Sequence, residues 1–218
     1  MTGRAGWLRR RAGGPLHVVR SPAAPGAAVL LLYGGRSEGL GPPPPINLPA
    51  LRMRPFSRGV ARALAGRDVL VAEVRYRHRG WNGGRRDAAR DAEAAIATVR
   101  RTVGEVPVVL VGHSMGGRAA LRAAGDPMVR GVVALAPWCP PGEPVAHLAG
   151  RAVYLLHDEA DRVTSARESW EFVHRARSAG ADATGIPMRG GGHTMLGGSS
   201  GWKRRTVRLV AELLAPHT

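Results

Sequence analysis

Residues 106–117 read Val106-Pro107-Val108-Val109-Leu110-Val111-Gly112-His113-Ser114-Met115-Gly116-Gly117. The aliphatic, mostly β-branched run predicts a buried parallel strand that stops at Gly112. Residues 118–124, Arg-Ala-Ala-Leu-Arg-Ala-Ala, have a helical composition and predict a helix directly afterwards. Between strand and helix lies Gly-His-Ser-Met-Gly, a Gly-x-Ser-x-Gly motif. The sequence therefore predicts a serine, Ser114, on a sharp strand-to-helix turn.

The spacing of this motif has a mechanical reason. A serine on so sharp a turn has a strained backbone, and side chains at the flanking glycine positions would clash. The turn also directs the free N–H groups of the helix N-terminus toward the serine. Because 30 of the 218 residues are glycine, the motif alone can arise by chance. Its placement between a buried strand and a helix is what makes Ser114 a candidate nucleophile.

Length and composition are those of a globular protein, with 218 residues and 44% hydrophobic content. We expect residues 1–14 to form a loose, basic, glycine-rich arm and residues 15–218 to form a single domain. The single cysteine, Cys139, excludes a disulfide within the chain. No apolar run approaches the ~20 residues that span a bilayer. We therefore expect a cytoplasmic protein without a membrane span; the sequence does not indicate its oligomeric state.

The charge is strongly positive, with 32 Lys and Arg against 16 Asp and Glu and a net charge of +16. Such a balance can indicate a nucleic-acid partner. Here nearly all the positive residues are arginine in a chain rich in Ala, Gly and Pro, which indicates coding bias. The arginines are spread along the chain, with short clusters at 9–11 and 85–86. We expect no nucleic-acid partner; salt-sensitive association with nucleic acid is the alternative.

Strand and helix patterns alternate along the chain. Apolar runs predict strands at residues 16–20, 27–33, 68–74, 106–111, 131–136, 152–157 and 183–188. Helices are predicted at residues 56–65, 87–103, 118–124, 164–178 and 202–214. Residues 34–55, which include four consecutive prolines at 42–45, are expected to form a long loop. The alternation predicts an α/β fold, a mostly parallel sheet with helices on both faces and no separate cap domain.

Sites in such sheets lie at the carboxyl ends of the strands, where Ser114 also lies. A serine hydroxyl needs a base to take its proton, and that base needs a third group to orient it. His193 is the candidate base because it follows the last predicted strand, and Gly190-Gly191-Gly192 lets its loop turn back toward the sheet. We expect His113 to support the loop around Ser114, and His157 to pack near the acid.

Three acidic residues follow the penultimate predicted strand: Asp158, Glu159 and Asp161. Their place at the carboxyl edge makes each a candidate to orient the histidine. Asp161 directly precedes a predicted helix, where a carboxylate also serves as part of the N-terminal cap. The residues alone leave the choice open.

Together, these features resemble the α/β-hydrolase family. In that family the nucleophile, acid and histidine occur in the order Ser…Asp/Glu…His, as Ser114, Asp161 and His193 do here. The acid turn of the family reads His-Gly-x-x-Asp-x-x-Val-Pro, and residues 157–164 read His-Asp-Glu-Ala-Asp-Arg-Val-Thr. The resemblance implies Asp161 as the acid. Asp158 replaces the glycine and the Val-Pro pair is missing, so Asp158 stays the alternative.

The resemblance, which covers about residues 16–214, also implies an oxyanion hole made of two backbone N–H groups. One is the amide of Met115, the first residue of the helix. The family takes the other from the loop after an earlier strand, often His-Gly-x, and here that loop reads Tyr33-Gly34-Gly35-Arg36. We expect Gly35 to be the donor, with Gly34 or Arg36 as alternatives.

These expectations describe a serine hydrolase that cleaves a small carboxylic ester or thioester through an acyl-enzyme on Ser114, without cofactor or metal. The alternatives are an amidase or peptidase of the same fold, and a non-catalytic binding or scaffold protein on that fold. Trp81, Trp138 and the proline-rich loop follow strand ends. They either line an acyl pocket or serve packing.

Overall fold

Seven strands form one sheet in the computed structural model, which describes residues 14–196 and 199–215. Apart from residue 14, the predicted basic arm lies outside the described residues. The strands are β1 (Leu16–Arg20), β2 (Ala27–Leu32), β3 (Val69–Val74), β4 (Val108–His113), β5 (Val129–Leu135), β6 (Ala152–Asp158) and β7 (Asp182–Met188). Their spatial order is β1-β3-β2-β4-β5-β6-β7. Only the pairing of β1 with β3 is antiparallel within this described sheet.

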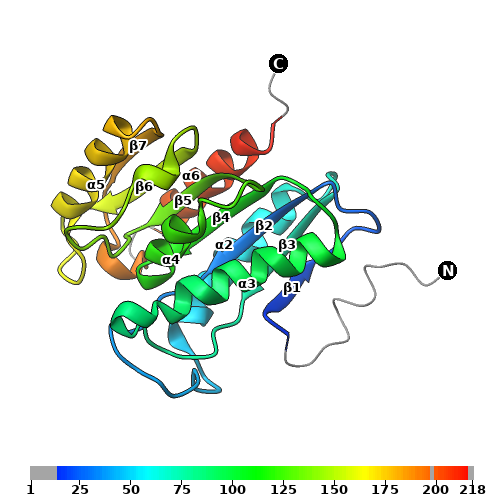
Figure 1. The fold of residues 1–218 in the computed structure, drawn as a ribbon, viewed down its shortest axis with the longest axis horizontal. Coiled ribbons are helices and arrows are strands. Elements are labelled where there is room, and N and C mark those ends of the chain that lie inside the picture. Colours follow the sequence, from blue (N-terminus) through cyan, green and yellow to red (C-terminus); the bar gives the residue numbers. More distant parts are fainter. Residues whose placement is uncertain (1–13, 197–198, 216–218) are drawn as a thin grey trace.

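Helices connect the parallel strands (Figure 1). The α-helices are α2 (Leu48–Ala63), α3 (Asp87–Thr102), α4 (Met115–Ala123), α5 (Ala166–Ser178) and α6 (Ser199–Leu213). Short 3₁₀ turns are η1 (Gly83–Arg85), η2 (Ala146–Leu148) and η3 (Gly192–Thr194). The connection between β5 and β6, all of which is described, contains η2 as its regular structure, so no cap domain is inserted there.

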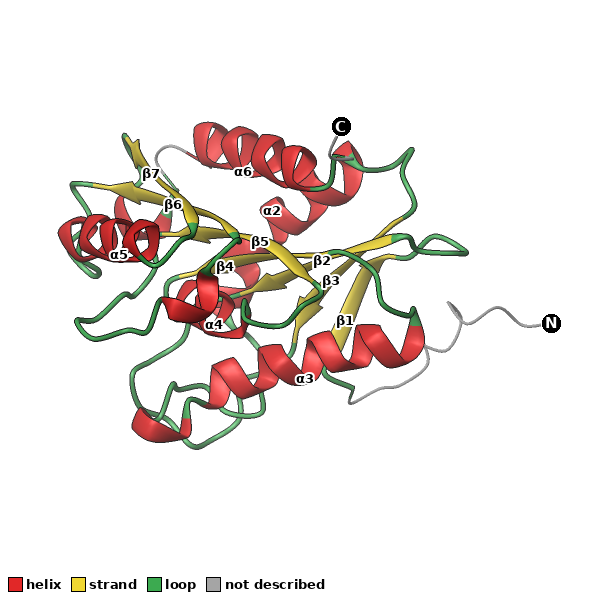
Figure 2. Cartoon of the chain, turned by 45° about the horizontal axis from the view of Figure 1, so that its top comes forward, coloured by secondary structure: helices red, strands yellow, loops and turns green. Residues whose placement is uncertain are grey.

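The alternation of side chains along the central strands divides the core into two layers. In β2, Leu30 and Leu32 belong to the layer under α3, α4 and α5, whereas Val29 and Leu31 belong to the layer under α2 and α6. Figure 2 shows these two groups of helices on opposite sides of the sheet. The predicted mostly parallel sheet with helices on both faces is confirmed.

The expected loop over residues 34–55 is wrong in its last third, because α2 begins at Leu48. Pro49 lies in the first turn, where a helix does not need the missing N–H group. Pro55 lies inside the helix and cannot donate to a preceding carbonyl. Its neighbours Met53 and Phe56 are buried against the sheet. This burial holds the helix together across the proline.

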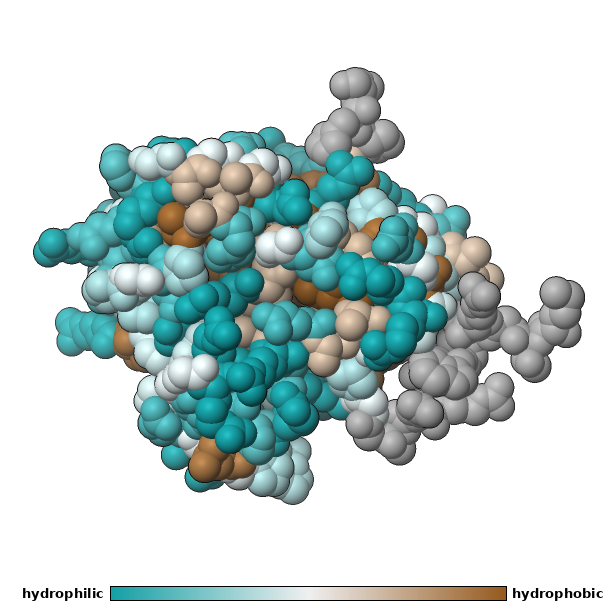
Figure 3. All heavy atoms as spheres, viewed as in Figure 1, coloured by the Kyte–Doolittle hydropathy of each residue, from teal (hydrophilic) through white to brown (hydrophobic). Residues whose placement is uncertain are grey.

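The described surface is polar on the face seen in Figure 3, where hydrophobic residues form small separate areas. Among the described helices, none combines the length and the apolar character needed to cross a membrane.

Candidate active site

Ser114 lies on a strained turn between β4 and α4. Its backbone has φ 56° and ψ −121°, outside the regions that residues with a side chain usually adopt. A Cβ atom on Gly112 would lie 2.7 Å from the Gly117 amide nitrogen, and one on Gly116 would lie 2.5 Å from the Leu32 carbonyl oxygen. Both glycines are therefore required by close backbone packing, which is the mechanical reason expected for the motif.

The structure brings the three predicted triad side chains together. The Nε2 atom of His193 lies 3.0 Å from Ser114 Oγ, and its Nδ1 atom lies 2.8 Å from Asp161 Oδ2. The three residues follow β4, β6 and β7, whose parallel carboxyl ends meet at one edge of the sheet. The imidazole can thus accept a proton from the hydroxyl on one nitrogen while it donates to the carboxylate from the other.

The Asp161 carboxylate is fully buried and surrounded by hydrogen-bond donors. Oδ1 accepts from the amides of Val163 and Thr164, at 2.7 and 3.1 Å. Oδ2 accepts from His193, from the Thr164 hydroxyl at 2.9 Å and from His157 Nε2 at 3.2 Å. Burial raises the pKa of this carboxyl, but the donors outweigh burial and hold it well below its usual range. Asp161 is ionised at neutral pH.

The alternative acid, Asp158, faces other partners. Its carboxylate accepts from the amides of Ala160 and Gly192, both at 3.0 Å. Asp158 therefore holds the loop that precedes His193, while Asp161 contacts the imidazole itself. Asp161 is not the cap of α5 either, because the N-cap is Ser165, whose hydroxyl accepts from the Glu168 amide.

His113 supports the loop of the candidate base. Its Nε2 atom lies 2.8 Å from the His193 carbonyl oxygen and must donate to it, because a carbonyl only accepts. Burial, followed by the nearby charge of His193, lowers the pKa of His113 from 6.5 to about 3. His113 is therefore a neutral donor across the whole physiological range. Its Nδ1 atom has no hydrogen-bond partner among the described residues.

The loop after β2 lies against the start of α4. A Cβ atom on Gly35 would lie 2.6 Å from the Met115 sulfur, so the two residues are in close contact. The Arg36 amide already donates to the Arg79 carbonyl at 3.1 Å, which occupies one alternative donor. Within the described part of the chain, the Gly35 amide in the loop and the Met115 amide at the start of α4 donate to no backbone carbonyl of another segment. Both remain available to an oxyanion, as does the amide of Gly34.

The two tryptophans of the strand-end loops enclose an arginine. The Arg118 guanidinium lies 4.0 Å from the ring centre of Trp81 and 4.3 Å from that of Trp138. Its Nε donates to Glu143 at 2.6 Å. Trp81 is buried, so its role is accounted for by core packing, whereas Trp138 is only partly buried.

Cys139, the residue after Trp138, is also buried. Burial raises the pKa of its thiol, so Cys139 is a poor nucleophile.

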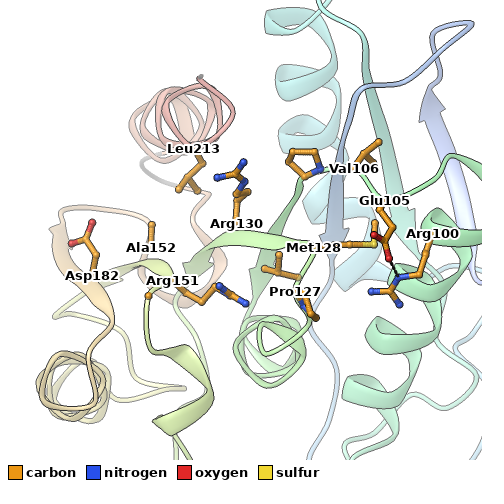
Figure 4. A pocket seen from close by; sticks show the side chains of 13 residues that line it. Arg100, Glu105, Val106, Pro127, Met128, Arg130, Arg151, Ala152, Asp182 and Leu213 are labelled. Atoms are coloured by element: carbon orange, nitrogen blue, oxygen red, sulfur yellow. Dashed lines mark ion pairs between the residues drawn. The ribbon is translucent and has the colours of Figure 1, made fainter. Parts of the chain in front are cut away.

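A cavity of about 620 Å³ lies away from this edge (Figure 4). Its described lining includes Val106, Val129, Ala152 and Asp182, which lie at or just before the amino ends of β4 to β7. A second cavity, of about 550 Å³, is formed by residues 159 and 161–167 with Trp170 and reaches Asp161 from the side of α5. Neither of these two linings includes Ser114, which is itself buried.

The family assignment follows from a comparison with known proteins. The chain matches the family described as "Alpha/beta hydrolase domain" over residues 50–169, more than half of its length. It belongs to the α/β-hydrolase family. The predicted resemblance is thereby confirmed for family and fold. No match was found among curated protein sequences.

Solved structures share the fold of this α/β hydrolase. The propionate-bound esterase 2 of Thermogutta terrifontis is 20% identical, with a TM-score of 0.67 over 93% of this chain and 91% of that chain. TT1662 from Thermus thermophilus is 17% identical, with a TM-score of 0.65 over 93% and 94%. A serine hydrolase homologue from Coxiella burnetii is 18% identical, with a TM-score of 0.62 over the same shares. Identities this low establish the common fold alone.

Two features in or beside the candidate site were not found from the sequence. The Thr164 hydroxyl lies among Asp161, His157 and His193, and its only sequence signal was the departure from the Val-Pro pair. Arg118 lies four residues after Ser114, one helical turn along α4, and its place between two tryptophans carried no sequence signal.

Proposed function

We propose that this protein is a serine hydrolase that cleaves a carboxylic ester or thioester through an acyl-enzyme on Ser114. The observation that carries the proposal is the position of the His193 imidazole, which bridges Ser114 Oγ at 3.0 Å and Asp161 Oδ2 at 2.8 Å. The first distance allows a general base to take the proton of the serine hydroxyl. The second allows the carboxylate to orient the imidazole.

In the first half of the reaction, Ser114 Oγ attacks the carbonyl carbon of the substrate while His193 Nε2 takes the hydroxyl proton. The Asp161 carboxylate stabilises the resulting imidazolium. The amides of Met115 and Gly35 stabilise the negative oxygen of the tetrahedral intermediate. When the intermediate collapses, His193 gives its proton to the leaving alcohol or thiol, and the acyl group stays on Ser114.

In the second half, His193 takes a proton from water, and the hydroxide attacks the acyl carbonyl. The new tetrahedral intermediate expels the Ser114 oxygen, which regains its proton from His193, and the carboxylic acid leaves. His193 carries every proton in this cycle, so the scheme calls for no metal or cofactor.

Short acyl esters are the substrates to test first. Related forms of the Thermogutta esterase carry butyrate or propionate, and another is phosphonylated by sarin. The proposal therefore includes sensitivity to organophosphorus reagents.

The test is labelling with a fluorophosphonate probe, together with hydrolysis of p-nitrophenyl acetate, butyrate and octanoate. Ser114→Ala should lose the label and lower the rate by at least about 10⁴-fold. Ser37→Ala, an exposed serine on the loop at the same edge, should keep both. Folded protein that takes no label, or equal rates for wild type and Ser114→Ala, would leave the non-catalytic alternative in place.

A further inference from the structure

Thr164 has a hydroxyl in the middle of the buried polar network. Thr164 Oγ1 lies 2.9 Å from Asp161 Oδ2 and 3.1 Å from His193 Nδ1. It also lies 3.2 Å from the Ala136 carbonyl oxygen and 3.3 Å from His157 Nε2. Four partners surround one oxygen that has a single proton to donate.

The same residue holds both oxygens of the carboxylate. Its amide donates to Asp161 Oδ1 at 3.1 Å while its hydroxyl reaches Oδ2. Three residues after the acid, the family pattern has valine, which keeps the amide and the branched shape but has no hydroxyl. The hydroxyl is thus a departure of this chain from that pattern.

His157 completes the surroundings of Oδ2. Its Nδ1 atom lies 2.7 Å from Ser169 Oγ, and its Nε2 atom faces the carboxylate. The assignment that satisfies both contacts has Ser169 donate to Nδ1 and Nε2–H donate to Asp161. Oδ2 therefore has three donors, and the Thr164 hydroxyl shares that oxygen with His193.

We propose that the Thr164 hydroxyl is a positioning group that holds Asp161 and weakens its attraction for the His193 imidazolium, so that the enzyme stays active at lower pH. The inference rests on the proposed function. A hydrogen-bond donor to a carboxylate oxygen stabilises the negative charge, and the same oxygen then interacts less strongly with a second positively charged partner. With the hydroxyl present, the imidazolium gains less from Asp161, and the proposed activity is expected to extend further into acid.

Other charged or titratable groups face this network, and a change at Thr164 leaves all of them in place. They are His113 on β4, Arg52 on α2, whose charge acts on His113, and His157 and Asp158 on β6. A difference between wild type and a Thr164 variant therefore reports on the hydroxyl.

The experiment measures kcat/KM for p-nitrophenyl butyrate against pH in wild type, Thr164→Val and Thr164→Ser. We expect the acidic limb of Thr164→Val to move upward by about 0.5 to 1 pH unit. Thr164→Ser should return the limb to the wild-type position. Ser165→Ala is the matched control, because it removes the α5 cap next to Thr164 without touching the triad, and its limb should not move.

Three results would overturn the proposal: an unmoved limb in Thr164→Val, a limb moved to lower pH, or a serine variant that behaves like the valine variant. Movement to lower pH would mean that the hydroxyl donates to the Ala136 carbonyl and accepts from His193 instead.

A second readout separates this inference from the proposed function. The imidazole N–H protons of wild type and Thr164→Val are titrated by NMR, and the His193 signal is assigned by its loss in His193→Ala. If wild type neither hydrolyses esters nor takes the probe, the proposed function fails, and the titration still tests the hydroxyl. Equal titrations in both proteins would then overturn the inference on its own.

Discussion

His113 Nε2 donates a hydrogen bond to the backbone carbonyl of His193, 2.8 Å away, and joins the central strand β4 to the loop of the proposed base. The donor sits one residue before Ser114. This hydrogen bond therefore ties the turn of Ser114 to the loop of His193, in addition to the contact between their side chains.

The burial of His113 makes the stability of the protein depend on pH, and the hydrogen bond to His193 only partly opposes this effect. The folded state lowers the pKa of His113 to about 3, whereas an unfolded histidine titrates near its ordinary 6.5. Below 6.5 the unfolded state binds a proton that the folded state does not. The stabilisation is complete above 6.5 and is lost toward pH 3, by about 1.4 kcal/mol per pH unit.

Urea unfolding between pH 7 and pH 4 measures this effect. Wild type should lose stability faster than His113→Gln over that range, while His17→Gln, on an exposed residue of β1, should follow wild type. Parallel pH dependences for wild type and His113→Gln would contradict the prediction.

The choice of acid is tested by paired substitutions. Asp161→Asn should lower kcat/KM by about 10⁴-fold, because an amide facing Nδ1 favours the wrong histidine tautomer. Asp158→Asn should lower it by less than about tenfold, since Asp158 contacts the amides of Ala160 and Gly192. Steady-state kinetics with p-nitrophenyl butyrate decides, and the reverse ranking would make Asp158 the acid.

The proposed oxyanion loop is tested at Gly35. Gly35→Ala would bring a Cβ within 2.7 Å of the Arg79 carbonyl oxygen, as well as against the Met115 side chain, so the loop must move. We expect kcat to fall by about 10²- to 10³-fold with a small change in KM, as when one oxyanion donor is lost. Gly41→Ala on the same loop meets no described atom within 4 Å and serves as the control. Equal kcat values for the two variants would place the second donor elsewhere.

The sequence predicted those parts of the candidate site that depend on the order of residues along the chain or on their position directly after a strand. Ser114 follows β4 and His193 follows β7, and parallel strands bring their carboxyl ends to one edge of the sheet whatever the details of packing. The start of α2 could not be predicted in this way, because Pro49 and Pro55 argue for a loop, and only the burial of Met53 and Phe56 decides otherwise.

Contacts between distant segments were also beyond the sequence. The place of Arg118 between Trp81 and Trp138 depends on how α4 packs against two loops. The four partners of the Thr164 hydroxyl come from the residue after β5, from the end of β6, from the turn after β6 and from η3. No local sequence pattern relates these four segments to one another. Such features require the three-dimensional arrangement.

The place of β7 has a consequence for how the protein fails under heat. β7 is a terminal strand of the sheet, bonded on one side to β6, and His193 follows it directly. The Trp202 indole fastens this region from α6 by donating to the Gly190 carbonyl at 3.0 Å. Local unfolding of β7 would displace the proposed base, His193, while the central strands stay paired. Inactivation should therefore precede the loss of secondary structure on heating, and it should reverse on cooling.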